Sequence, residues 1–467
     1  MNKLVSSLKE AIKLANLKDG MTVSFHHHLR NGDHVLNMVM DEISALGIKN
    51  LTVNASSLFD VHMPIVDHIK NKTVTKIATD YVSANLGKIF SEGIMKNPIE
   101  FRTHGGRPAD IESGKTPIDV AFIAAPTSDN MGNCTGKTGK SACGSLGYAF
   151  ADAMHAKKVI LITDNLVEYP LYNPSINEKY IDFVVKVDAI GDPKGIVSGT
   201  TRITRDPIGL IMAANAAKVI EASGLLKDGF SFQTGAGGAS LAAAKFLKDI
   251  MLKKQITGSF GLGGITGYMV DMLKCGCFKE LLDVQCFDLN AVESIRENPN
   301  HKEISAIEYA SPNNPNAAVN NLDVVILGAT EIDTDFNVNV HTDSNGFMMG
   351  GSGGHSDTAA GSKLSMIIAP MFRARLPIIT DRVTCVSTPG KDIDVLVTQG
   401  GIAVNPKNTE LKQKLIDAKL PVIDIFDLKK KVESITGVPN KLPKGDRQVA
   451  TIIGRNGDIL DNIYNVI

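Results

Sequence analysis

The chain repeats parts of its own sequence at long range, and this repeat restricts the folds that it can adopt. Residues 17–23 (LKDGMTV) return as residues 226–232 (LKDGFSF), about 209 positions later. In the same order, residues 118–124 (IDVAFIA) return as residues 322–328 (LDVVILG), about 204 positions later. Solenoid repeats are only roughly 20–50 residues long, so a period of this length indicates a duplicated domain.

Short apolar runs alternate with helical patterns in both halves. The runs of the second repeated pair are almost wholly apolar, as expected of parallel strands that have helices on both faces. Helical patterns occur, for example, at residues 143–155 and 241–252. The alternation predicts an α/β fold with two similar domains, each a largely parallel sheet flanked by helices. We expect an N-terminal domain at residues 1–224 and a C-terminal domain at residues 225–467.

A β-hairpin is expected at the C-terminal end. Residues 448–454 and 459–460 are strand-like, and Asn456-Gly457 stands between them. Asn-Gly is the favoured pair of a two-residue type I′ turn, in which both residues have φ > 0. The sequence therefore predicts positive φ at both positions.

Composition argues against nucleic-acid and membrane partners. The formal net charge is −1, tryptophan is absent and aromatic residues make up 5% of the chain, so no nucleic-acid partner is expected. The apolar runs, such as residues 159–162, are far shorter than a membrane span, and the charged first ten residues do not resemble a signal peptide. We therefore expect a cytoplasmic protein.

Neither the cysteines nor the histidines predict a metal site. None of the six cysteines makes a C-x-x-C pair, and cytosolic thiols stay reduced. His26, His27 and His28 follow a strand-like run, in which successive side chains point to opposite faces. Three adjacent histidines of a continuing strand cannot converge on one ion, so we expect no metal.

Residues 342–357 (TDSNGFMMGGSGGHSD) form a glycine-dense segment. Glycine permits φ > 0 and close approach to the backbone, whereas inside a helix or strand each glycine costs about 0.5–1 kcal/mol. The flanking residues 337–340 and 363–369 have ordered, apolar patterns, which argues against a flexible linker. We expect backbone N–H groups of this loop to face a negatively charged ligand. A tight turn without a ligand is the alternative.

Three long motifs carry a resemblance to a known family. They are residues 101–107 (FRTHGGR), residues 135–147 (TGKTGKSACGSLG) and residues 342–357, and residues 395–403 (VLVTQGGIA) look like a late strand and turn of the same proteins. Over essentially its whole length the chain resembles the α subunits of citrate lyase, within the coenzyme A transferase superfamily. The resemblance implies two similar α/β domains with the active site between them.

The resemblance also implies a reaction and its partners. Acetyl-acyl-carrier-protein and citrate would give citryl-acyl-carrier-protein and acetate, the first step of citrate cleavage to acetate and oxaloacetate. The implied partners are an acyl carrier protein (the γ subunit) with a phosphopantetheine-type prosthetic group resembling coenzyme A, and a citryl-ACP lyase (the β subunit) in an oligomeric complex. No cofactor is expected to be bound covalently to this chain. Whether the natural acid substrate is citrate or citramalate stays open.

One position departs from the superfamily pattern. Typical coenzyme A transferases carry a glutamate nucleophile in a Ser-Glu-Asn-Gly segment, whereas Ser344 precedes Asn345-Gly346 here. A serine needs a partnered base to act as a nucleophile, so this departure favours direct attack by bound citrate. Asp343 is the alternative nucleophile, although in a strand-like segment it would face the other way.

The resemblance implies a site built from both halves. The expected catalytic residues are Ser344, Asn345, Gly353 and Gly354, and the pantetheine thioester is expected at Gly351, Ser352, Gly353, Gly354 and His355. The expected substrate-binding residues of the first half are His104, Gly105, Gly106 and Arg107, because a guanidinium can bind a carboxylate through two hydrogen bonds. Weaker candidates for the citrate carboxylates are Arg373, Arg375, Lys137, Lys140, Arg202 and Arg205.

Two other functions stay open at this point. An ordinary acyl-CoA:carboxylate CoA-transferase would use free coenzyme A and a glutamate nucleophile. A non-catalytic subunit would bind the carrier protein without performing chemistry on it.

Overall fold

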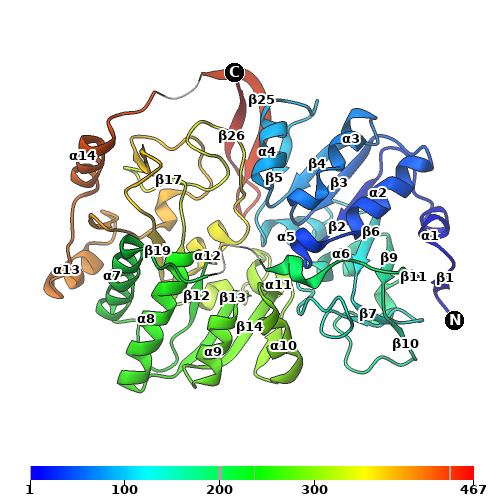
Figure 1. Ribbon diagram of the computed structural model, residues 1–467, viewed down its shortest axis with the longest axis horizontal. Helices are drawn as coiled ribbons and strands as arrows, with labels where there is room; N and C mark the ends of the chain where they lie inside the picture. The colour runs from blue at the N-terminus through cyan, green and yellow to red at the C-terminus, as the bar shows by residue number, and fades with distance from the viewer. Residues whose placement is uncertain (1, 198–201, 236, 441–442) are drawn as a thin grey trace.

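The first half of the molecule is built on a ten-stranded sheet (Figure 1). The computed structural model describes residues 2–197, 202–235, 237–440 and 443–467. In spatial order the strands are β1 (Leu4–Val5), β11 (Phe183–Lys186), β9 (Lys158–Thr163), β6 (Val120–Ala124), β2 (Thr22–Phe25), β3 (Leu51–Ala55), β4 (Val74–Thr79), β5 (Ile99–Phe101), β25 (Lys444–Ile453) and β26 (Ile459–Val466). All neighbouring strands pair in parallel except β25 and β26.

The second half is built on an eight-stranded sheet of similar design. In spatial order its strands are β15 (His301–Glu303), β14 (Phe278–Cys286), β13 (Gly258–Ile265), β12 (Phe232–Thr234), β16 (Val324–Leu327), β19 (Leu364–Ile368), β23 (Val395–Thr398) and β24 (Gly401–Val404). Only β23 and β24 pair antiparallel in this sheet.

The two sheets have the same strand order, which confirms the α/β fold class with two similar, largely parallel sheets. Reading from β11 to β5 in the first sheet gives the same succession as reading from β23 to β15 in the second. The first repeated sequence leads into β2 and β12, which hold equivalent central positions, and the second repeated sequence forms β6 and β16 beside them. The long-range repeat of the sequence is therefore a repeat of topology.

Helices and short sheets complete the two halves. The α-helices are α1 (Leu8–Leu14), α2 (Val35–Ala45), α3 (Ile65–Lys70), α4 (Ala84–Ser91), α5 (Gly106–Glu112), α6 (Ala149–His155), α7 (Pro207–Ser223), α8 (Gly238–Lys254), α9 (Gly267–Lys274), α10 (Leu289–Glu297), α11 (Ala306–Ala310), α12 (His355–Gly361), α13 (Thr409–Asp417) and α14 (Ile425–Thr436). The short strands are β7 (Thr127–Asp129), β8 (Cys134–Thr135), β10 (Leu166–Val167), β17 (Glu331–Asp333), β18 (Val338–Asn339), β20 (Phe372–Arg373), β21 (Leu376–Pro377) and β22 (Ile379–Thr380). Within the described ranges, no helix is long and apolar enough to cross a membrane.

The C-terminal hairpin belongs to the first sheet, although it ends the chain. Figure 1 shows β25 and β26 beside β5, and Ala450 of β25 pairs in parallel with Ile99 of β5. Residues of the expected C-terminal domain therefore join the sheet of the first half. The domain boundary at residue 224 stays a prediction. The hairpin forms as expected, but its predicted type I′ turn is wrong: the strands are separated by residues 454–458, and of the Asn-Gly pair only Gly457 has positive φ, at 86°.

Apolar packing joins the two halves into one continuous body. Tyr148 of the first half lies in a buried cluster with Val284, Ala306 and Tyr309 of the second. Such packing is as dense as in any protein interior, so it holds the connecting loops in fixed positions. The loops that follow β4 and β5 are thereby held against the glycine-dense segment of the second half.

Candidate active site

Two loops, one from each half, meet backbone to backbone. Thr103, which follows β5, forms a parallel bridge with Gly353, which precedes α12. The His104 N–H donates to the Gly353 carbonyl at 2.9 Å, and the Gly353 N–H donates to the Asp80 carbonyl at 3.3 Å. This junction brings together the motif of residues 101–107 and the glycine-dense segment. It gives a geometric basis to the prediction that the two halves share one site.

The glycines of the second loop are required by close packing. A Cβ atom on Gly351 would lie 2.1 Å from the Asp80 carbonyl oxygen, and one on Gly354 would lie 2.5 Å from the Tyr309 hydroxyl. Gly353 has φ of 50° and faces the His104 ring, which a Cβ would approach to 3.3 Å. Contact with the first half explains Gly351 and Gly353, and contact with Tyr309 of the second half explains Gly354. Their expected contact with a thioester stays a prediction.

Asp357 fastens the two loops together from the first turn of α12. Its carboxylate accepts a hydrogen bond from the Thr103 hydroxyl at 2.8 Å and another from the Gly105 N–H at 2.9 Å. The Thr103 hydroxyl in turn accepts the Gly106 N–H at 2.8 Å. Burial raises the pKa of Asp357 to about 6, against the two hydrogen bonds, which lower it. The predicted substrate residues Gly105 and Gly106 are therefore positioned by this carboxylate.

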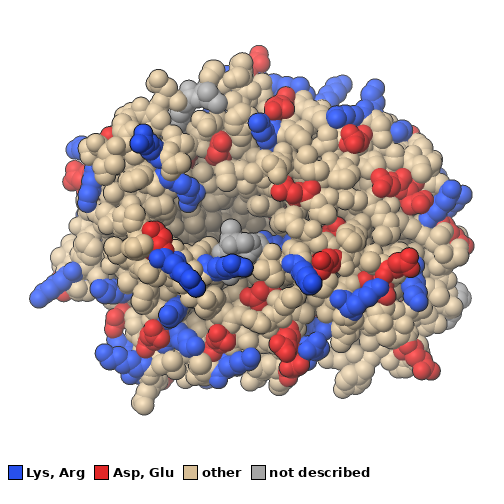
Figure 2. All heavy atoms as spheres, in the orientation of Figure 1, with Lys and Arg blue, Asp and Glu red and all other residues tan. Residues whose placement is uncertain are grey.

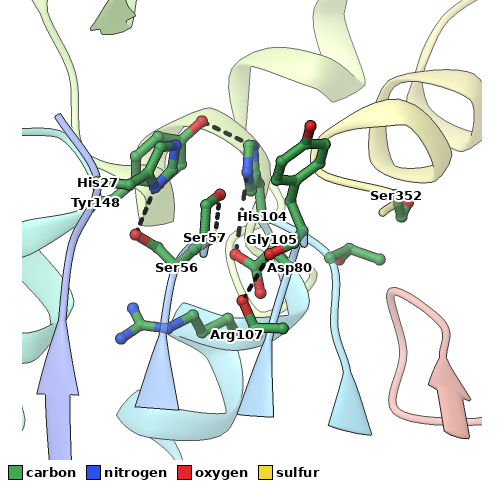
Figure 3. A network of polar contacts seen from close by, with 12 residues as sticks. His27, Ser56, Ser57, Asp80, His104, Gly105, Arg107, Tyr148 and Ser352 are labelled. Atoms are coloured by element: carbon green, nitrogen blue, oxygen red, sulfur yellow. Dashed lines mark hydrogen bonds and ion pairs between the residues drawn. The ribbon is translucent and has the colours of Figure 1, made fainter. Parts of the chain in front are cut away.

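His104 lies at the centre of the junction. Its Nδ1 atom makes a 2.7 Å hydrogen bond with the Tyr148 hydroxyl, and its Nε2 atom is 4.0 Å from the Asp80 carboxyl (Figure 3). Burial lowers the pKa of His104 to about 3, and the charge of Arg107 acts in the same direction. The imidazole is therefore neutral at physiological pH and is held by Tyr148 in one orientation.

Asp80 was not among the residues expected from the sequence. It follows β4 and is 1% exposed, yet neither carboxyl oxygen has a hydrogen-bond partner among the described residues. Burial raises the pKa of Asp80 well above its usual value. A buried acid without a partner beside a histidine is a marked sign of a functional site. The sequence feature that could have indicated Asp80 is an acidic residue directly after a strand.

Arg107 does not have the geometry expected of a substrate ligand. Its guanidinium makes two hydrogen bonds to Asp152, at 2.8 and 2.9 Å, and its Nε donates to Asn54 at 2.7 Å. The side chain is also buried, with Arg107 only 2% exposed. Because Asp152 already occupies the guanidinium, the structure argues against the predicted carboxylate-binding role of Arg107.

Ser352 and His355 are tied to the second half. The Ser352 N–H donates to His341 Nε2 at 3.2 Å, and its hydroxyl lies 2.8 Å from the Ser356 hydroxyl. His355 bonds through Nδ1 to the Thr388 hydroxyl at 2.8 Å and through Nε2 to the Gly328 carbonyl at 2.9 Å. Both ring nitrogens of His355 are thus engaged within the protein, and its expected contact with the thioester stays a prediction.

Ser344 and Asn345 lie in a separate tight turn. The Asp343 carboxylate closes this turn by accepting the N–H groups of Asn345 and Phe347, both at 2.9 Å. Among the described residues, neither the Ser344 nor the Asn345 side chain makes a hydrogen bond, and both residues are half-buried. The structure therefore leaves these two side chains free for other contacts, whereas Asp343 has a structural role.

Three of the weaker cation candidates lie outside the His104 junction. Lys137 pairs with Glu303 at 2.9 Å beside a surface cavity of about 690 Å³. Arg373 and Arg375 do not lie on one continuous strand, because a turn separates β20 from β21 and Arg375 itself has φ of 65°. Neither arginine is part of the His104 junction.

The three adjacent histidines belong to the interior of the first half. β2 ends at Phe25, so the expected strand does not continue through them. His26 Nε2 accepts the Ala124 N–H at 2.8 Å, whereas His27 Nδ1 bonds to the Ser56 hydroxyl at 2.6 Å. Within the residues that the structure describes, no group of three or more histidine, cysteine, aspartate or glutamate residues is placed to hold a metal ion.

The duplicated sheets and the junction between them define a coenzyme A transferase-like α/β protein. The α subunit of a malonate decarboxylase from Acinetobacter baumannii has the same fold, with a TM-score of 0.70 over 94% of this chain and 91% of that chain. The two sequences are only 15% identical, so this likeness concerns the fold alone.

Sequence comparison identifies the family. The family model "Citrate lyase, alpha subunit (CitF)" matches residues 1–466. The citrate lyase alpha chains of Klebsiella pneumoniae and Haemophilus influenzae are each 49% identical to it over 464 residues, which is 99% of this chain and 91% and 93% of theirs. The crystal structure of a citrate lyase alpha subunit from Streptococcus mutans in complex with citrate is 48% identical, with a TM-score of 0.98 over 100% of this chain and 92% of that one. The chain belongs to the citrate lyase alpha subunit family, as its motifs predicted.

Proposed function

We propose that this chain transfers an acyl carrier protein thioester from acetate to citrate, giving citryl-acyl-carrier-protein and acetate. One observation carries the proposal: the His104 loop and the Gly353 loop meet at a junction where the buried Asp80 carboxyl has no hydrogen-bond partner among the described residues. Family membership supports the same reaction. The grouping of a neutral histidine, an unused acid and loop N–H groups suits a reaction in which negative charge develops on oxygen.

The exchange requires two attacks on carbonyl carbons. A carboxylate of citrate attacks the acetyl thioester, which expels the thiolate and forms a mixed anhydride of acetate and citrate. The thiolate then attacks the citryl carbonyl and releases acetate. Each attack passes through a tetrahedral oxyanion, and one N–H donor to such an oxyanion typically contributes about 2.7–4 kcal/mol.

The chain offers two kinds of donor to these oxyanions. The Gly354 N–H has no acceptor among the described residues, and it lies in the loop that contacts the first half. Burial raises the pKa of Asp80, and in its protonated form this carboxyl can donate an O–H without repelling an anion. Both groups are already fixed in place, so neither has to reorganise during the reaction.

Direct attack by the substrate fits the surroundings of Ser344. Its hydroxyl has no hydrogen-bonded base among the described residues, and such a base would be needed to make it a nucleophile. Asp343 is engaged by two backbone N–H groups, which holds it in the turn. We therefore propose that no acyl group is carried on the enzyme.

The partners follow from the family. The Streptococcus mutans relative binds citrate, and we propose citrate as the acid here, with citramalate as the competitor to be tested. Figure 2 shows the face between the two halves hollowed near its centre, with Lys and Arg side chains along one edge of the hollow. Such cations favour the approach of anionic partners. The γ carrier protein with its phosphopantetheine-type group, the β lyase subunit and the cytoplasmic location stay predictions.

Label exchange with the purified chain tests the proposal. Radiolabelled citrate and unlabelled acetyl-acyl-carrier-protein should give labelled citryl-carrier and free acetate without any other subunit. Absence of label from the carrier, with a correctly folded chain, would contradict the proposal. Running the same assay with citramalate decides which acid is preferred.

Two controls separate the alternative functions. An ordinary CoA-transferase forms an enzyme-bound thioester on glutamate, which borohydride traps in the presence of acyl-CoA; we expect no such trapping. Gly353→Val should abolish acetate release but spare assembly with the carrier, because the added side chain crowds His104 in a backbone conformation with φ of 50°. Full turnover by this variant would show that the loop is not catalytic.

A further inference from the structure

Arg30 is a half-buried cation placed between the two halves, and its Nη1 atom is buried. It begins the 3₁₀ turn η1 (Arg30–Gly32) with φ of 53°, a conformation that non-glycine residues rarely adopt. Its guanidinium carbon lies 5.4 Å from the ring centre of Phe59 in the first half and 5.0 Å from that of Phe287 in the second. Strained backbone that presents a charged side chain at such a junction is typical of functional residues.

The guanidinium has no counter-charge in the part of the chain that the structure describes. Its Nη1 atom is buried without a hydrogen-bond partner, and no carboxylate forms an ion pair with it there. Burial lowers the pKa of Arg30, although arginine stays charged at any physiological pH. A donor of a charged group that is shielded from water is normally paired, so the unpartnered Nη1 atom indicates that its partner arrives with a ligand.

Aromatic contacts lead from Arg30 to the catalytic junction. Phe59 packs against His27 with ring centres 5.9 Å apart, and His27 stacks on Tyr148 at 4.8 Å. Tyr148 is the residue whose hydroxyl bonds to His104, as Figure 3 shows. The charge of Arg30 helps to lower the pKa of His27, and Tyr148 acts to raise the pKa of Arg30, so these groups share one environment.

We propose that Arg30 binds a carboxylate of the polycarboxylate substrate, the role that the sequence had suggested for Arg107. Arg107 is neutralised by Asp152, whereas Arg30 Nη1 has no hydrogen-bond partner among the described residues and belongs to a planar fork that matches a carboxylate. A substrate with three carboxylates has one to react and two to be held. This inference rests on the proposed function and names the residue that holds one of the non-reacting carboxylates.

Substitution of Arg30 with kinetic analysis of both substrates tests this role. Arg30→Gln should raise the KM for citrate roughly 10- to 100-fold, as expected for loss of a charge-assisted pair, and leave the KM for the acetyl-carrier within about twofold. Arg30→Lys keeps the charge but not the planar fork, so its KM for citrate should lie between those of wild type and Arg30→Gln. The backbone strain at position 30 is similar in wild type, Arg30→Gln and Arg30→Lys, because each of the three residues has a Cβ. Arg296→Gln, which removes an exposed arginine paired with Glu297, is the matched control and should behave as wild type.

Citrate binding without turnover provides a second readout. Citrate should raise the Tm of the wild type and of Arg296→Gln, whereas this shift should be lost or greatly reduced in Arg30→Gln. An unchanged KM for citrate, or a raised KM for the acetyl-carrier alone, would overturn the inference. If Arg30→Gln does not fold, the KM values and the citrate-induced Tm shift of Arg30→Lys are compared with those of wild type instead. Failure of the proposed function would appear differently, as absence of exchange in the wild type.

Discussion

At the scale of single residues, burial and pairing decide which charged groups are available. Arg107 is buried and Arg30 is half-buried, but Asp152 neutralises the first, and no described carboxylate pairs with the second. The sequence contains the motif around Arg107 but not the identity of its partner, which lies 45 positions away. Asp80 escaped prediction for the same reason, since the sequence does not show that its carboxyl lacks a hydrogen-bond partner among the described residues.

The raised pKa of Asp80 gives a prediction with a definite sign. A carboxyl with a raised pKa in the folded protein favours folding below its unfolded pKa near 3.8, and this contribution is lost as the pH rises through the folded pKa. Asp80→Asn keeps the shape and removes the titration. Calorimetry should therefore find the Tm of the variant close to wild type near pH 4 and progressively higher than wild type toward pH 8. A variant that becomes less stable than wild type as the pH rises would contradict a raised pKa for Asp80.

At the scale of elements, sequence patterns located helices and strands but not all of their ends. A helix was predicted at residues 143–155, yet α6 begins only at Ala149. Gly144 has φ of 85°, and the Ser145 hydroxyl donates to the Asp283 carbonyl of the second half at 2.8 Å. Contacts with a distant part of the chain thus override the local helical pattern, and such contacts cannot be read from a single segment.

The link between α12 and the loop after β5 should be sensitive to Asp357. Asp357→Ala leaves the Gly105 N–H and the Thr103 hydroxyl without an acceptor, and each buried unmet group costs about 1–3 kcal/mol. We expect a loss of about 2–5 kcal/mol in unfolding free energy and a fall in kcat, because the loop that carries His104 is released. Asp357→Asn, which keeps one acceptor, should lose less in urea titrations. Equal stability of the alanine variant and wild type would show that the link is unimportant.

At the scale of the whole molecule, the duplication could be predicted from the sequence. The pairing of the C-terminal hairpin with the first sheet could not. Repeated sequences at β2, β12, β6 and β16 mark the equivalent strands of the two sheets. The chain order places the hairpin after the second half, but its apolar side chains pack on the first sheet, with Ala450 and Ile452 both almost fully buried. Which sheet edge a terminal hairpin joins depends on three-dimensional packing that its own sequence does not specify.

Removal of the hairpin should therefore damage the first half. Deleting residues 444–467 uncovers the edge of β5, and unpaired strand edges promote association between chains. We expect the truncated chain to aggregate or to elute earlier in size-exclusion chromatography, with a lower Tm. Deleting Ile467 alone, which is 76% exposed, is the control and should have no effect. A truncated chain with the elution and Tm of the full chain would contradict this assignment.

The central claim is that a citrate carboxylate attacks the acetyl thioester directly, without an acyl group on the enzyme. A single turnover with citrate labelled by ¹⁸O in its carboxylates tests it, because the bridging oxygen of a direct mixed anhydride leaves with acetate. The account predicts one ¹⁸O atom in the acetate of the first turnover, measured by mass spectrometry with enzyme in excess. Unlabelled acetate in that turnover would show that an enzyme carboxylate supplied the oxygen and would contradict the account.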